Sequence, residues 1–399
     1  MTMKENEIQV LGHSPEREQR RRYWIGSAIV AAVMLVVGCL IGKFAFRESR
    51  IEQQPSYGES TIDSTLQVTV DSLLRDKMTE IAAQSGQAIV MEVASGEIRA
   101  MVGLQKSFDG EYEPCQNFGH QQESGLMRGV SMLAVLEDGK DINLGTEVET
   151  VNGIYYYEGR VIKDHNWHRG GYGKLTMEEV LMFGSNVGVC RLVDEVYGDN
   201  PQRFFDRLTR MSFGQPDSLY DLTCLRPMIY SAPTDSCWTK SELALHSFGC
   251  ERLIAPLQTL TFYNAIANGG QMVQPMLHRR DTVVINPKIA SEESIRQMQT
   301  AMRNTVSEGL GRKAGTDIVE VAGLTGTAQV THGMSDDDGE DYNNSEYRVE
   351  FCGCFPAERP RYSIIVTLNK IGYPASGGGQ AGPVFRQIVE YICGREPIQ

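Results

Sequence analysis

The segment from Val321 to Val330 constrains the fold of this chain more than any other stretch. It reads VAGLTGTAQV, an apolar start followed by alternating small and hydroxyl residues around two glycines. This alternation is typical of a β-strand, and a glycine inside a strand often marks a close approach of a ligand or of another backbone. The segment therefore predicts a strand that forms one wall of a ligand site.

The composition is that of a folded, acidic protein. Hydrophobic residues make up 41% and charged residues 22% of the 399 residues, so the chain is neither collagen-like nor wholly disordered. Its length suffices for one large domain or two ordinary ones. The formal net charge of −13 argues against nucleic acid as the main partner.

A membrane anchor is predicted near the N-terminus, because the residues from Tyr23 to Gly42 carry no charge. A helix of that length measures roughly 30 Å, which matches the hydrocarbon core of a bilayer. Three arginines at 20–22 precede the span, although Lys43 and Arg47 follow it. The positive-inside rule then favours a cytoplasmic tail at 1–22 and an exported body. A buried core helix is the alternative, but such helices usually carry a polar face.

A polar stalk over 43–65 is expected to hold the body, residues 66–399, away from the membrane. The nine cysteines show no zinc-binding spacing. No metal site is expected, and no cofactor is expected either. Cys224 and Cys237 flank a Pro-containing stretch and are the first candidates for a disulfide in an exported body. The alternative is that most cysteines are small buried apolar residues.

Hydrophobic periodicity predicts a body of interspersed helices and strands. Apolar residues at helical spacing predict helices over 71–84, 128–139 and 292–308, and one helix or two over 176–196 with a break at Gly184. Asp71 is the expected N-cap of the first helix. Alternating residues predict a hairpin over 87–93 and 97–102, and further strands over 350–355 and 362–368.

Five segments resemble the transpeptidase domain of class B penicillin-binding proteins, in that family's order. They lie at 90–101 (VMEVASGEIRAM), 184–188 (GSNVG), 241–270 (including APLQ and ANGG), 324–329 (LTGTAQ) and 377–393 (GGGQAGPVF at its start). The resemblance runs from about Leu66 to Cys393. It implies an α/β (α+β) fold of the serine transpeptidase or β-lactamase-like type, in which helices flank a mainly antiparallel sheet, here with one N-terminal transmembrane helix.

The resemblance also implies where a catalytic centre would lie. In the family, a Ser at the start of a helix attacks an amide carbonyl, and a Lys at i+3 carries the proton. Alignment on the helix that ends LEDGK places Gly125 at the Ser and Arg128 at the Lys. The guanidinium of Arg does not deprotonate in proteins. No Ser in the chain has Lys three residues later.

The other two family motifs have each lost one group as well. The Ser-x-Asn motif falls at 184–186, with Gly184 in place of Ser, and the Lys-Thr-Gly strand has Leu324 in place of Lys. Three such losses imply a domain without this acyl-transfer chemistry and without catalytic residues. The residues that remain as candidates for a binding cleft are Ser124, Ser185, Asn186, Thr325, Gly326 and Thr327.

Three functions follow as hypotheses. The preferred one is a non-enzymatic bacterial envelope protein that binds a cell-wall peptide, or a division or elongation protein, outside the inner membrane. The second is an active D,D-transpeptidase or carboxypeptidase that uses Ser124 or Ser131 as its nucleophile; the missing Ser-x-x-Lys motif argues against it. The third is a sensor that retains a ligand cleft without turnover, with Asn186, Thr325 and Thr327 as hydrogen-bond donors.

Three further features have plainer explanations. His165 and His168 are more typical of surface polar groups than of metal ligands. The acidic loop 336–341 lacks the spaced Glu that closes a calcium loop, which favours a solvated run of charges. His246 is expected to be a buried, hydrogen-bonded histidine.

Overall fold

The computed structural model describes residues 58–116, 118–119, 122–214, 218–219, 222–223, 240–250, 254–330, 344–396 and 398. The chain divides into two units, 1–57 and 58–399, and the described residues all belong to the second. The predicted tail and span, the acidic loop and the Cys224–Cys237 pair lie outside the described residues. Among the residues that are described, no helix combines the length and the apolar character needed to cross a bilayer.

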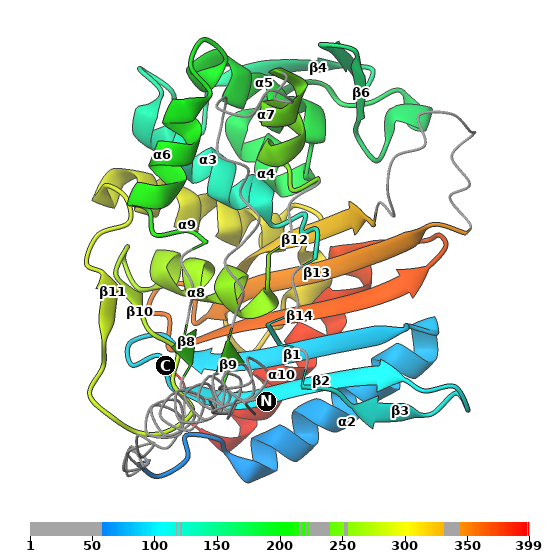
Figure 1. Ribbon diagram of the computed structural model, residues 1–399, viewed down its shortest axis with the longest axis vertical. Coiled ribbons are helices and arrows are strands. Elements are labelled where there is room, and N and C mark those ends of the chain that lie inside the picture. Colours follow the sequence, from blue (N-terminus) through cyan, green and yellow to red (C-terminus); the bar gives the residue numbers. More distant parts are fainter. Residues whose placement is uncertain are drawn as a thin grey trace, which may run out of the picture. The chain divides into compact units, whose positions relative to one another are not determined.

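One six-stranded sheet forms the centre of the body (Figure 1). Its strand order is β12-β13-β14-β1-β2-β3, and every neighbouring pair is antiparallel. The prediction of a mainly antiparallel sheet is therefore confirmed. The strands are β1 (Ser85–Glu92), β2 (Ile98–Lys106), β3 (Tyr112–Pro114), β12 (Ala322–Gln329), β13 (Glu346–Phe355) and β14 (Tyr362–Ile371).

Helices pack on both faces of this sheet, as predicted (Figure 1). Helices α2 (Ser64–Ile81) and α10 (Gly382–Arg395) cover one face, and α8 (Pro256–Ala267) covers the other. Strand β1 is apolar on both sides for this reason: Ala88 and Val90 join the first core, whereas Ile89 and Met91 join the second. The second core extends into a group of helices, α3 (Met127–Asp138), α4 (Met177–Phe183), α5 (Asn186–Tyr197), α6 (Gln202–Arg210), α7 (Lys240–Ser247) and α9 (Glu292–Ser307).

The remaining described elements are short. Four two-stranded sheets pair β4 (Glu147–Val151) with β7 (Gly173–Thr176), β5 (Ile154–Tyr157) with β6 (Arg160–Lys163), β8 (Ser218–Leu219) with β9 (Leu222–Thr223), and β10 (Met272–Val273) with β11 (Val284–Asn286). Single helical turns are η1 (Trp167–Arg169), η2 (Arg312–Ala314) and the π-type η3 (Gly377–Ala381), which leads into α10.

Helix α2 begins earlier than the sequence pattern predicted. Asp63, not Asp71, is its N-cap, and the Asp63 carboxylate accepts hydrogen bonds from the backbone N–H groups of Thr65 and Leu66, both at 2.9 Å. The unit that contains the body begins at residue 58, so it includes residues 58–65 of the predicted stalk. Thr61 is buried, and its hydroxyl donates to the carbonyl oxygens of Ile98 and Met276.

The stretch 176–196 forms two helices, α4 and α5, as in the second of the predicted alternatives. Gly184 ends α4 with φ of 63°, in the left-handed region that favours glycine. Ser185 then caps α5, because its Oγ accepts a hydrogen bond from Gly188 N at 2.9 Å. The break places Ser185 and Asn186 at the start of a helix that packs beside α3.

Candidate functional site

The start of α3 lies directly against the backbone of β12. A Cβ atom added to Gly125 would lie 2.5 Å from Thr327 N and 2.9 Å from Thr327 O. Both distances are shorter than real Cβ contacts, and a strand backbone cannot rotate away as a side chain can. The position aligned with the family's nucleophile therefore has no room for a side chain in this structure.

Arg128 holds a buried position one turn further along α3. Its Nη1 donates to Asn186 Oδ1 at 3.0 Å, and its Nη2 donates to Thr325 O at 3.3 Å. Burial lowers the pKa of Arg128, while Tyr263, Asp164 and Glu350 partly oppose the shift. An Arg side chain nevertheless remains protonated at neutral pH. Arg128 thus ties α3, α5 and β12 together and cannot take up a proton.

The residues of the second motif are occupied by structural hydrogen bonds. Ser185 is fully buried, and its Oγ donates to Asp164 Oδ2 at 2.8 Å. Burial raises the pKa of Asp164, although hydrogen bonds from Val187 N and Ser185 act in the opposite direction. Asn186 Nδ2 donates to the carbonyl oxygen of Lys163 at 3.1 Å. Both motif residues therefore connect the start of α5 to the end of β6 and to the residue that follows it.

Leu324, in the third motif, is a core residue. Its side chain is buried on the face of β12 that contacts the helical group. A Cβ atom added to Gly129 of α3 would lie 2.8 Å from Leu324 Cδ1 and 2.2 Å from Tyr263 Oη. Leu324 and Tyr263 thus fill the space beside Gly129, and Tyr263 Oη is fixed by donating to Leu126 O at 2.7 Å.

The two threonines of β12 contact the C-terminal part of the chain. Thr327 Oγ1 accepts a hydrogen bond from Gly377 N at 3.1 Å. A Cβ atom added to Gly378 would lie 3.1 Å from Thr325 Cγ2, so the η3 turn packs closely on the strand. Thr325 is only 9% exposed. Of the predicted cleft residues, Ser124, Ser185 and Thr325 are therefore buried, and the hydroxyl of Thr327 already has a partner.

A buried chain of charged and polar groups adjoins Gly125. Ser124 Oγ donates to Glu350 Oε2 at 2.6 Å, and Arg348 Nε donates to Glu350 Oε1 at 2.7 Å. Arg348 and Glu350 are 1% and 0% exposed. Arg348 Nη1 also donates to Gln122 Oε1 at 2.5 Å. This chain, Gln122–Arg348–Glu350–Ser124, links the segment before α3 to β13.

Arg348 and Glu350 are not among the candidate residues that the sequence indicates. The predicted strand begins at Glu350, whereas β13 begins at Glu346 and includes both residues on one face. A signal was present, because opposite charges at i and i+2 in a strand lie on the same side. Alternation alone could not show that this side faces the protein interior.

Comparison with known proteins identifies the fold family. Residues 86–390 match the model of the penicillin binding protein transpeptidase domain. The chain belongs to this family. Its members include the solved transpeptidase domain of Burkholderia pseudomallei penicillin-binding protein 3, which superposes with a TM-score of 0.70 at 24% sequence identity, over 84% of this chain and 96% of that one.

Two curated relatives are longer than the part that this transpeptidase-family chain matches. The chain is 28% identical to the peptidoglycan D,D-transpeptidase FtsI of Escherichia coli K12, over 82% of this chain and 54% of FtsI. It is 25% identical to the penicillin-binding protein PbpB of Mycolicibacterium smegmatis, over 85% of this chain and 54% of PbpB. The chain thus spans about half the length of the curated relatives it matches.

Ser131, His165 and His246, the other residues that the sequence singled out, each have their own surroundings. Ser131 is buried, and its Oγ donates to Ser247 O at 2.6 Å. His165 Nε2 lies 2.8 Å from Tyr172 Oη, and His246 is fully buried next to the ring of Phe205. Within the described ranges, no group of three or more His, Cys, Asp or Glu residues is arranged to hold a metal ion.

Replacing Leu324 by Lys is expected to lower the free energy of unfolding by about 2 kcal/mol, because an ammonium group would enter the apolar core beside Gly129. Thermal unfolding measures this change. Val161→Lys, on the half-exposed face of β6, provides the control and should leave the melting temperature nearly unchanged. An unchanged melting temperature for Leu324→Lys would mean that this side chain faces solvent.

Proposed function

We propose that this transpeptidase domain has lost acyl transfer and acts by binding, in peptidoglycan synthesis or division. The candidate ligands are a cell-wall peptide and a division or elongation protein. The main support is the closed contact at Gly125, where the strand backbone fills the place of a nucleophile's side chain. Similarity to a peptidoglycan D,D-transpeptidase supports the cell-wall context.

Acyl transfer requires a nucleophile and a group that takes its proton at the moment of attack. Gly125 has no side chain, and Arg128 cannot act as a base. When nucleophile and base act as a unit, losing both removes several orders of magnitude in rate. The proposal therefore predicts a domain that binds without turnover.

One observation favours the alternative of an active enzyme. Ser124 Oγ lies 2.6 Å from a Glu350 carboxylate oxygen, and a hydroxyl paired with a carboxylate is one arrangement for an activated nucleophile. Two facts weigh against it. Ser124 is 1% exposed, and proton uptake by Glu350 would break its buried ion pair with Arg348. The Ser124–Glu350 contact is better explained as part of the structural network.

Intact-mass spectrometry after long incubation with benzylpenicillin distinguishes the two functions. The expected result is an unchanged mass for this protein, under conditions in which an active penicillin-binding protein, used as the positive control, becomes fully acylated. A reversible rise in melting temperature without an adduct would support ligand binding without turnover. A stoichiometric adduct on Ser124, Ser131 or Ser185 would return the protein to the active class, and its loss in Ser124→Ala would identify that nucleophile.

We also propose that the span Tyr23–Gly42 anchors the protein with its body outside the cytoplasm. The uncharged run and the arginines before it support this topology. Alkaline phosphatase fused after Gln399 should be active, because that enzyme requires an exported, oxidising compartment. An inactive phosphatase fusion, together with fluorescence from a C-terminal reporter that folds only in the cytoplasm, would contradict this topology.

A further inference from the structure

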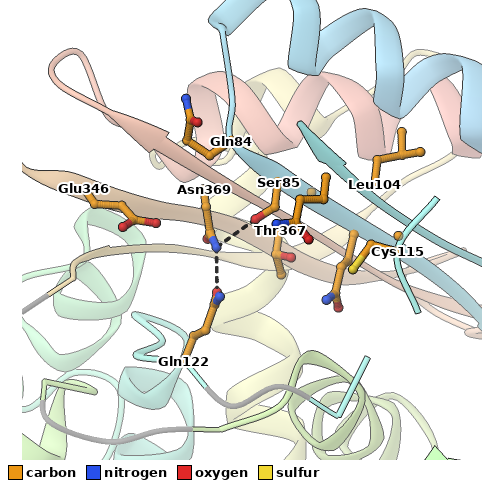
Figure 2. A pocket seen from close by; sticks show the side chains of 12 residues that line it. Gln84, Ser85, Leu104, Cys115, Gln122, Glu346, Thr367 and Asn369 are labelled. Carbon is orange, nitrogen blue, oxygen red and sulfur yellow. Dashed lines mark hydrogen bonds between the residues drawn. The ribbon is translucent and has the colours of Figure 1, made fainter. Parts of the chain in front are cut away.

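A polar cavity of about 260 Å³ opens on one face of the sheet (Figure 2). Arg348 and Glu350 lie on the same face, because they pair with the lining residues Asn369 and Thr367. Strands β1, β2 and β14 form its floor, which Cys115 continues through a hydrogen bond from its N–H to Gly103 O of β2, and Gln122 lies on the opposite wall. Four carboxamide side chains belong to this lining: Gln87, Gln105, Gln122 and Asn369. Gln84 also borders the cavity, but its side chain points away from it (Figure 2). None of the three degenerate motifs contributes a residue to it.

Strand register explains why these polar groups gather. Ser85 pairs with Asn369 on one side and with Gln105 on the other, so the three side chains form a row across one face. Asn369 Nδ2 donates to Ser85 Oγ at 3.1 Å and to Gln122 Oε1 at 2.9 Å (Figure 2). The last contact joins the floor to the opposite wall. The cavity is therefore a built feature of the fold, with fixed polar groups on both sides.

The lining chemistry selects a class of ligand. A carboxamide offers one acceptor oxygen and two N–H donors, the groups that pair with the N–H and C=O of a peptide. Among the described lining residues, Glu346 is the one that carries a charge, and its negative charge disfavours a carboxylate ligand. None of the lining residues that the structure describes is aromatic, so none of them could support the apolar face of a sugar. The volume lies just below the usual range for ligand pockets, which suits a ligand of about two residues.

We propose that this cavity binds a short neutral peptide segment through its backbone amides. The site would be new for this chain and separate from the region around Gly125. Gln122 connects the two, because its Oε1 also accepts from Arg348 Nη1, and Arg348 leads through Glu350 to Ser124. A peptide that hydrogen-bonds Gln122 would therefore alter the hydrogen-bond chain that ends at Ser124, just before α3.

Cys115 supplies a direct probe, because it lines the cavity and is a free, partly buried thiol. The experiment follows alkylation of the full-length chain by iodoacetamide, with peptide mapping, at increasing concentrations of N-acetyl-Ala-Ala-amide. The expected result is a saturable slowing at Cys115 of about threefold or more, with no change at Cys393, which is also partly exposed but lies outside the cavity. The free acid N-acetyl-Ala-Ala should bind about tenfold more weakly because of Glu346.

Substitutions test whether the lining carboxamides are responsible. Gln105→Met, at an exposed position of β2, removes one or two hydrogen bonds to the peptide. It should raise the peptide concentration needed for half-maximal protection of Cys115 about five- to tenfold. Gln202→Met, the same change on the exposed part of α6, should leave the protection unchanged. Thr367→Val, an isosteric change in the floor, provides a second variant if Gln105→Met folds poorly.

Two results would overturn the proposal. One is no saturable protection of Cys115 by the neutral dipeptide, and the other is equal protection in wild type and in both cavity variants. Neither result depends on acylation by penicillin, so the proposed loss of acyl transfer stands or falls separately.

Discussion

Glu350→Gln is expected to lower the free energy of unfolding by about 3–5 kcal/mol. Glu350 and Arg348 are both buried, and breaking such a pair leaves one charge uncompensated in the interior. The substitution also disturbs the hydrogen bond from Ser124, which holds the segment before α3. Urea unfolding of the purified chain measures the change.

Two further variants separate the ion pair from a general effect of losing a charge. Glu390→Gln removes the partner of Arg386 in an exposed i,i+4 pair of α10, and should change stability by less than about 0.5 kcal/mol. The double variant Arg348→Met with Glu350→Leu should recover much of the loss, because a buried pair can be replaced by apolar groups. A loss below about 1 kcal/mol for Glu350→Gln would show that water or other groups compensate the Arg348 charge.

Gly125→Ser is expected to destabilise the protein by about 3 kcal/mol and to give no penicillin adduct. The added Cβ would meet Thr327 N at 2.5 Å, so β12 or the start of α3 must move. Thermal unfolding and intact-mass spectrometry measure both outcomes. Gly394→Ser is the matched control, because a Cβ at Gly394 meets no atom within 4 Å. Unchanged stability together with an adduct at position 125 would show that the cleft opens readily.

The sequence predicted the fold well where local pattern and burial agree. The hairpin of β1 and β2 and the helices α3 and α9 lie close to their predicted bounds, because each has a clear apolar stripe or alternation. The motif alignment brought together Arg128, Asn186 and Thr325, which the structure joins by hydrogen bonds. Spacing within a family fold is enough to place such residues near one another.

The sequence could not predict what these residues do once they are together. Whether Gly125 leaves an open space or a closed contact depends on how far β12 approaches α3, which is a tertiary distance. The Asp63 cap was missed because the first turn of α2 is polar and shows only one apolar residue, Leu66. The pairing of Arg348 with Ser124 through Glu350 joins segments more than 200 residues apart, beyond any local pattern.

The close fit around Gly125 and Gly129 makes the proposed loss of activity hard to reverse in evolution. These glycines lie one helical turn apart. The backbone of β12 packs against Gly125, and the side chains of Leu324 and Tyr263 pack against Gly129. A single substitution that restores a side chain at 125, or a Lys at 324, would clash with or disturb packed neighbours. It would lower the stability of the fold without restoring catalysis. Stepwise return to an active enzyme would therefore pass through less stable intermediates, and selection for folding alone would keep the domain in the binding role proposed above.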